Sequence, residues 1–177
     1  MNIIKCTKVI IITFFFILIF NQSKAETKFA IVEIDKIMKE SLVGKSLFQQ
    51  LDKLDSDNKK DYIEKRKKLF LRKDKINSQK TVLSKDEYEK KVIELNNEFE
   101  KFKKEGNKKI INLRTKRDNA MRKLLDELRV ILSKYSDENN LAFIIDQKNI
   151  IIGKADLNVT SEILKRLNAK IKKIKVN

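Results

Sequence analysis

Few side chains in this 177-residue sequence could act as acids, bases, nucleophiles or metal ligands. The chain has no histidine, the commonest acid–base group and metal ligand, and its single cysteine is Cys6. Asp35 and Asp146 each end a short apolar run, but an aspartate at a strand end more often caps the next turn than performs catalysis. The sequence has no glycine-rich phosphate loop. We therefore expect neither an enzyme nor a bound metal or cofactor.

The first 25 residues have the pattern of a secretory signal peptide. Lys5 and Lys8 precede an apolar run over residues 9–20, and Ser23-Lys24-Ala25 places small residues where a signal peptidase cuts. This run is shorter than the roughly 20 residues that span a bilayer, so we expect cleavage after Ala25 and export. An uncleaved membrane anchor is the alternative. Because Cys6 lies in the signal, the exported chain would have no disulfide.

The charge of the chain is strongly positive. Lysine and arginine total 41 against 25 acidic residues, which gives a net charge of +16, and 34 of the 41 are lysines. Lysine is a mobile point charge that is poor at site-specific recognition, so the surplus favours acidic partners or an anionic surface. Nucleic-acid binding is disfavoured, because the chain has a signal peptide, little arginine and no groove-reading module.

Residues 45–135 predict an antiparallel helical hairpin. Apolar residues recur at steps of three and four with no proline, which places one narrow apolar stripe on charged helices. The periodicity stops near residues 77–83, and Ser84 followed by Glu87 has the spacing of a capping box at a helix start. Residues 59–80 are mostly basic and residues 82–100 mostly acidic, which favours pairing across a turn. We expect this hairpin to be an exposed arm.

Three short apolar runs flank the hairpin, at residues 29–34, 141–145 and 150–152. Their β-branched composition predicts three strands, followed by a C-terminal helix. A sheet this small is stable only when helices or other chains pack against its faces and edges. The hairpin provides little such packing, and we therefore expect the chain to oligomerise through this region. The predicted fold is α+β, mostly α, with residues 26–44 and 136–177 as a β-body. The oligomerisation candidates are Phe29, Ile31, Val32, Ile34, Phe143, Ile144, Ile145 and Ile151.

The order and spacing of these pieces resembles the Skp/OmpH family of periplasmic chaperones over essentially all of the mature chain. The matching pieces are Lys28-Phe-Ala-Ile-Val-Glu-Ile-Asp35, Glu40-Ser-Leu-Val-Gly-Lys45, Leu141-Ala-Phe-Ile-Ile-Asp146, Ile150-Ile-Ile152, Asp156-Leu-Asn158 and Ile163-Leu-Lys165. None is diagnostic alone, and Asn158 stands where the family commonly has threonine. The resemblance implies a homotrimer in the periplasm, with three arms around a cavity that holds unfolded outer-membrane proteins without ATP.

A holdase needs a mobile, partly apolar surface rather than a tight site, because its clients are unfolded and varied. The client-contact candidates on the hairpin are Tyr62, Lys65, Leu69, Arg72, Ile76, Tyr88, Phe99 and Phe102. For each aromatic side chain the alternative is that it only packs the two helices together. Gly106 is either a flexible point or a place of close helix approach. The rival functions are an envelope coiled-coil spacer and a protein that binds an anionic lipid surface.

Overall fold

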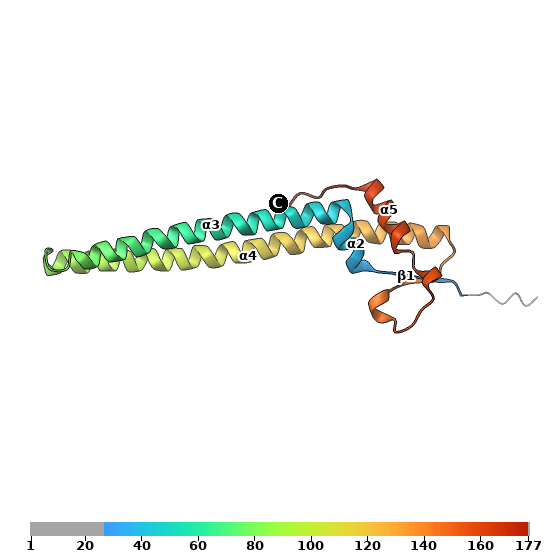
Figure 1. Ribbon diagram of the computed structural model, residues 1–177, viewed down its shortest axis with the longest axis horizontal. Helices are drawn as coiled ribbons and strands as arrows, with labels where there is room; N and C mark the ends of the chain where they lie inside the picture. The colour runs from blue at the N-terminus through green and yellow to red at the C-terminus, as the bar shows by residue number, and fades with distance from the viewer. Residues whose placement is uncertain (1–26, 177) are drawn as a thin grey trace, which may run out of the picture.

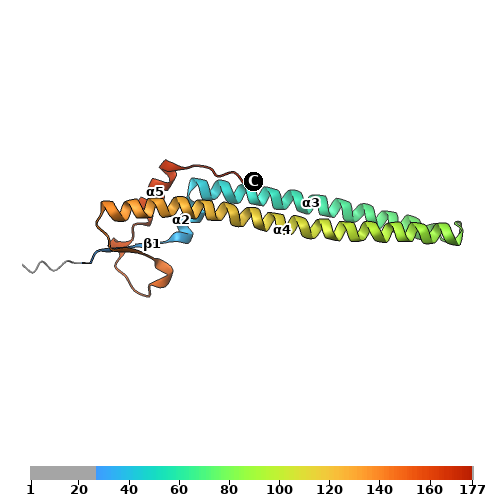
Figure 2. The same cartoon turned by 180° about the vertical axis from the view of Figure 1, so that it is seen from behind.

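A long helical hairpin with a small body at one end makes up the protein (Figure 1 and Figure 2). The computed structural model describes residues 27–176, so the expected signal peptide, with Cys6 and the cleavage point after Ala25, lies outside the described residues. The hairpin consists of α3 (Leu42–Ser78) and α4 (Lys85–Glu138). At 1.5 Å per residue, the 54 residues of α4 extend over about 80 Å.

The body is built from the two ends of the described chain. Its elements are β1 (Phe29–Val32), α2 (Ile34–Glu40), β2 (Phe143–Asp146), the 3-10 turns η1 (Gln147–Asn149) and η2 (Ala155–Leu157), and α5 (Thr160–Lys170). The mostly helical α+β fold expected from the sequence is confirmed. Within the body, however, the strands differ from the prediction in number and length.

The sheet has two strands, so the prediction of three is wrong. β1 and β2 pair in parallel, with Phe29 opposite Phe143. The other side of β1 is taken by the residues before α5, where the Val159 N–H donates to the Ile31 carbonyl oxygen at 2.9 Å. Residues 150–152 are therefore left without a strand partner in residues 27–176, and β-branched composition alone does not form a strand. Ile34, expected to end the first strand, begins α2 instead.

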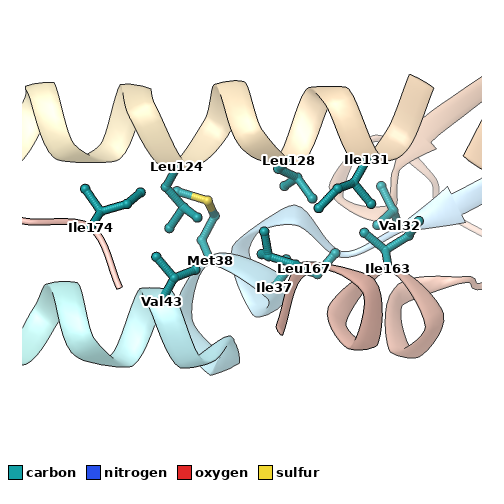
Figure 3. Close-up of a cluster of buried hydrophobic side chains, with 10 residues drawn as sticks. All are labelled: Val32, Ile37, Met38, Val43, Leu124, Leu128, Ile131, Ile163, Leu167 and Ile174. Carbon is teal, nitrogen blue, oxygen red and sulfur yellow. The ribbon is translucent and has the colours of Figure 1, made fainter. Parts of the chain in front are cut away.

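The body has a core that is mostly helical (Figure 3). The buried side chains come from β1, from α2 to α5 and from the residues after α5: Val32, Ile37, Met38, Val43, Leu124, Leu128, Ile131, Ile163, Leu167 and Ile174. Three of them, Leu124, Leu128 and Ile131, lie on the last turns of α4. The expectation that the hairpin offers the body little cover is therefore wrong, because the C-terminal part of α4 packs against the body and forms one wall of this core.

A sharp break between α2 and α3 sets the direction of the arm. Ser41 ends α2, donating its N–H to the Ile37 carbonyl oxygen, and also caps α3, accepting from the Gly44 N–H at 3.0 Å. The two helices come so close here that a Cβ at Gly44 would lie 1.8 Å from the Met38 carbonyl oxygen. Glycine at this position is what allows the backbone of α3 to pass over α2.

Candidate binding surface

The aromatic candidates of the hairpin lie at the contact between α3 and α4. The Tyr62 ring stacks on Phe102 with centroids 4.6 Å apart, and Phe99 meets Phe70 edge to face at 5.9 Å. Such pairs contribute about 0.5–1.5 kcal/mol beyond their buried area, so they hold the two helices together. Tyr62 nevertheless keeps 44% of its surface exposed, which leaves part of its ring open to a partner.

The charged candidates pair across the hairpin. Lys65 Nζ lies 3.0 Å from Glu105 Oε2, and the Arg72 guanidinium lies 2.5 Å from Glu98 and 3.6 Å from Glu94. These groups are about half exposed, so each pair contributes little to the stability of the fold. Their main effect is to favour one register of α3 on α4.

The far end of the hairpin is closed by a capping box. The Ser84 hydroxyl accepts from the Glu87 N–H, and the Glu87 carboxylate accepts from the Ser84 N–H. Hydrogen bonds from Ser84 hold the pKa of Glu87 below its ordinary value. Tyr88 donates to Asn77 across the turn at 3.5 Å. Of the two remaining apolar candidates on α3, Ile76 is buried near this end and Leu69 is half-buried.

Several large apolar side chains face outward and were not among the client-contact candidates. Ile63, Leu71, Ile93, Ile110 and Ile111 are each at least 59% exposed. A signal for them exists in the sequence, because they occur beside other apolar residues, as in Ile110-Ile111. Adjacent helical residues point about 100° apart, so a narrow contact cannot cover both members of such a pair, and at Ile110-Ile111 it covers neither.

Three of these side chains lie with half-exposed Tyr62 and Phe70 along two hollows that share Ile63. We call the five residues the apolar strip: Tyr62, Ile63, Phe70, Leu71 and Ile110. Tyr62, Ile63 and Ile110 line a groove of about 530 Å³ between α3 and α4. Ile63 also lines an adjoining hollow of about 360 Å³ with Phe70 and Leu71. Gly106 forms part of the groove, and a Cβ there would lie 3.4 Å from the Tyr62 ring.

Cations surround the apolar strip. The Arg66 guanidinium lies 5.4 Å from the centre of the Phe70 ring, and Lys73 Nζ lies 6.0 Å from the same ring. Lys59 and Lys103 contribute to the lining of the groove. A surface that combines exposed apolar side chains with positive charge suits many weak contacts with a flexible, acidic chain.

We expect acid to loosen the hairpin. Asp61 accepts a hydrogen bond from Lys109, and Glu100 one from Lys103, and these bonds hold the carboxyl pKa values below their ordinary 3.8 and 4.5. The pKa of each carboxyl is lower in the folded chain than in the unfolded chain. These bonds therefore stabilise the fold above about pH 4.5, and the stabilisation is lost as the pH falls through the pKa values of the folded chain. Thermal unfolding followed by circular dichroism should show a lower Tm at about pH 3 than at about pH 6.

Asp61→Asn supplies the control for the acid prediction. It removes the carboxyl that pairs with both Lys109 and Lys65, so the Tm of this variant should depend less on pH than the Tm of the wild type. A wild-type Tm that stays constant between about pH 6 and pH 3 would contradict the prediction.

Three of the oligomerisation candidates in the body are open to a partner. Phe29 and Phe143 stack on each other with centroids 5.6 Å apart, and Phe143 keeps 45% of its surface exposed. Ile151 is 99% exposed, and its neighbour Ile152 is 90% exposed. Isoleucines so fully exposed in adjacent positions are unusual and indicate an interaction surface.

The other five oligomerisation candidates are buried or partly buried within their own chain. Ile31 and Val32 are buried, and Ile34 and Ile144 pack against the body core. Ile145, opposite Ile31 in the sheet, is half-buried. Ile31 and Val32 therefore support the body from within, whereas Ile34, Ile144 and Ile145 keep part of their surface exposed.

The two carboxylates expected at strand ends have structural positions, although Asp35 lies in α2 and not at the end of β1. Asp146 caps η1 by accepting from the Lys148 N–H at 3.4 Å, as expected, and its carboxylate raises the pKa of Lys148. Asp35 lies in the first turn of α2, where a negative charge is favourable. Within residues 27–176, no three or more potential ligands gather as a metal site. The helices described there include none with the length and apolarity needed to cross a membrane.

Comparison with known proteins places the chain. Nothing among the curated proteins matches it. A crystal structure of an OmpH-like outer membrane chaperone from Caulobacter crescentus has the same fold, with a TM-score of 0.80 at 16% identity over 86% of this chain and 90% of that one. The family model of the outer membrane protein (OmpH-like) family matches residues 28–167. On that match, which confirms the resemblance seen in the sequence, the chain belongs to the OmpH-like family.

Proposed function

We propose that this protein is an ATP-independent periplasmic holdase that captures unfolded outer-membrane proteins on its helical arms and prevents their aggregation. Membership of the OmpH-like family supports a chaperone role. The observation that carries the finer proposal is the apolar strip, which stays exposed although its two aromatic side chains, Tyr62 and Phe70, also pack against the other helix.

The apolar strip suits a client without a fixed structure. Its hollows are open grooves between and beside two helices, so they can accept different side chains in turn. Each contact would be weak, and retention would come from several contacts made at once. The excess of positive charge would speed the capture of acidic clients.

We further propose that copies of the chain associate as a trimer through the body, so that several arms surround one client. Within residues 27–176, β2 has no strand partner on its second edge, and Phe143 on β2 and the Ile151-Ile152 pair in the loop after it are exposed. An open strand edge with exposed apolar neighbours readily pairs with another chain. Three arms would then supply the multiple contacts that retention needs.

Light scattering with an unfolded outer-membrane β-barrel protein tests the function. The exported chain, diluted with the client into buffer without ATP, should keep it in a discrete soluble complex whose mass corresponds to a trimer and one client. A chain that leaves the client to aggregate would overturn the holdase proposal. Co-sedimentation of such a chain with vesicles of anionic phospholipid would instead favour the lipid-surface function.

Replacing both exposed isoleucines of the body, Ile151→Asp and Ile152→Asp, should abolish the trimer. The charges would face apolar surface in the assembly but water in the single chain, so the folded chain should be little affected. Sedimentation should show the mass fall to about one third, with helicity by circular dichroism unchanged. Val82→Asp, at the far end of the hairpin and 83% exposed, is the matched control and should stay trimeric. If the doubly substituted chain remains a trimer, Ile151 and Ile152 do not form the trimer interface.

A further inference from the structure

The residues after α5 turn back and run along the start of α3 (Figure 1). We call residues 171–176 the strap. One side chain holds its backbone at two points: Gln50 Nε2 donates to the Ile174 carbonyl oxygen at 2.9 Å, and the Val176 N–H donates to Gln50 Oε1 at 3.3 Å. A single amide that satisfies both groups fixes the strap in one register on α3.

The apolar side chains of the strap contact both helices of the hairpin where they leave the body. Ile174 is 8% exposed and lies in the core cluster with Val43 of α3 and Leu124 of α4 (Figure 3). Val176 packs against a second cluster of Leu47, Leu51 and Ala120. The strap therefore ties α3 to α4 through two separate apolar contacts.

The hairpin is less tightly packed just beyond the strap. A hollow of about 650 Å³ lies between the helices there, lined among others by Phe48, Leu51, Ile110 and Leu113. The next close aromatic contact between the helices is the Tyr62–Phe102 stack. Closure of the two helices near the body thus depends on the small cluster at Leu47 and Leu51 together with the strap.

A lysine of the strap lies beside positively charged side chains of α4. Lys175 shares the lining of a hollow of about 320 Å³ with Lys116, Arg122 and Lys123 of α4. Asp126, in the same lining, pairs with Arg129 at 3.2 Å. Repulsion between these cations opposes closure, and dissolved salt weakens that repulsion.

We propose that the strap is a latch that holds the first turns of α3 against α4, and that ionic strength sets how often it opens. An open latch would let α3 separate from α4 near the body and so widen the arm. The family match ends at residue 167, so the latch lies outside what the match covers. The proposal stands independently of the holdase function, because it concerns only contacts within one chain.

Hydrogen exchange measured by mass spectrometry on the full chain tests the latch. Gln50→Met keeps the length and helix propensity of the side chain but removes both bonds to the strap. It should raise exchange over residues 42–58 by about fivefold to thirtyfold, the effect expected for losing one to two net hydrogen bonds. Residues 89–100, near the far end, should exchange as in wild type. Gln49→Met, at the adjacent exposed glutamine, is the matched control and should change neither segment.

Two further measurements separate the latch from a general loss of stability. Ile174→Ala keeps the backbone bonds to Gln50 but removes most of a buried side chain, so it should raise exchange over residues 42–58 more than Gln50→Met does. Lys175→Gln should act in the opposite direction and lower exchange there, as should added salt in the wild type. Equal exchange in the Gln50→Met and Gln49→Met chains would overturn the latch, as would a rise spread evenly over the whole hairpin. If neither added salt nor Lys175→Gln changes exchange over residues 42–58, then ionic strength does not control how often the latch opens.

Discussion

Gly44→Ala is expected to destabilise the protein by about 3 kcal/mol or more, in spite of the higher helix propensity of alanine. The new Cβ would lie 1.8 Å from the Met38 carbonyl oxygen and 2.9 Å from Ser41 Oγ. Met38 belongs to α2 and has its side chain in the core, so its backbone cannot move without disturbing the body. Urea unfolding followed by circular dichroism measures the loss, and a chain that does not fold at all would agree with it.

Gly106→Ala is the matched control for Gly44→Ala and should stabilise the protein where Gly44→Ala destabilises it. Gly106 lies within α4, and its added Cβ would meet the Tyr62 ring at 3.4 Å, an ordinary contact distance. Alanine should therefore stabilise the hairpin by up to about 1 kcal/mol through its helix propensity. Equal effects of the two substitutions would mean that the close approach at Ser41 does not govern the stability of the body.

A triple substitution in the apolar strip, Ile63→Gln, Leu71→Gln and Ile110→Gln, should weaken client holding by at least about tenfold while leaving the fold intact. The three side chains are 59–68% exposed, so glutamine costs little in packing and keeps the helix. Tenfold corresponds to about 1.4 kcal/mol, a modest share of the apolar contact that three such side chains can offer. The measurement is the chaperone concentration that halves aggregation of an unfolded barrel protein.

Ile93, Ile111 and Val130 provide a control of equal apolarity. They are 57–64% exposed on α4 and line neither hollow of the apolar strip. Glutamine at all three should reduce holding much less than the triple substitution in the strip. Equal losses from the two sets would show that holding depends on total apolar surface rather than on the strip.

Features that depend on neighbours in sequence could be predicted. The capping residues Ser84 and Glu87 are three positions apart, so their geometry is contained in one helical turn. The periodicity of the hairpin is likewise local, and it placed Tyr62 and Phe102 on the faces where the helices meet. Whether such a side chain is used in packing or left for a partner could not be predicted, because that depends on the width of a contact between two helices.

Features that depend on distant partners were missed. Residues 150–152 have a composition typical of a strand, but the β1 edge they would need is occupied by Val159. The break at Ser41 was also missed, because the need for Gly44 arises only when the Met38 backbone lies against it. Leu124 fits the helical period of the sequence, but none of its neighbours in sequence indicated that α5 would pack over it.

The parallel pairing of β1 and β2 has a consequence for how the chain folds. Phe29 and Phe143 are more than 100 residues apart, and the crossover between the two strands is the whole hairpin. Closing so long a loop is slow unless the helices pair first and bring its ends together, so the body should be the last part to form. In a chain made from its N-terminus, β1 has no partner until residue 146 has emerged. During that time β1 is an unpaired apolar strand, which is the same hazard that an unfolded barrel protein presents.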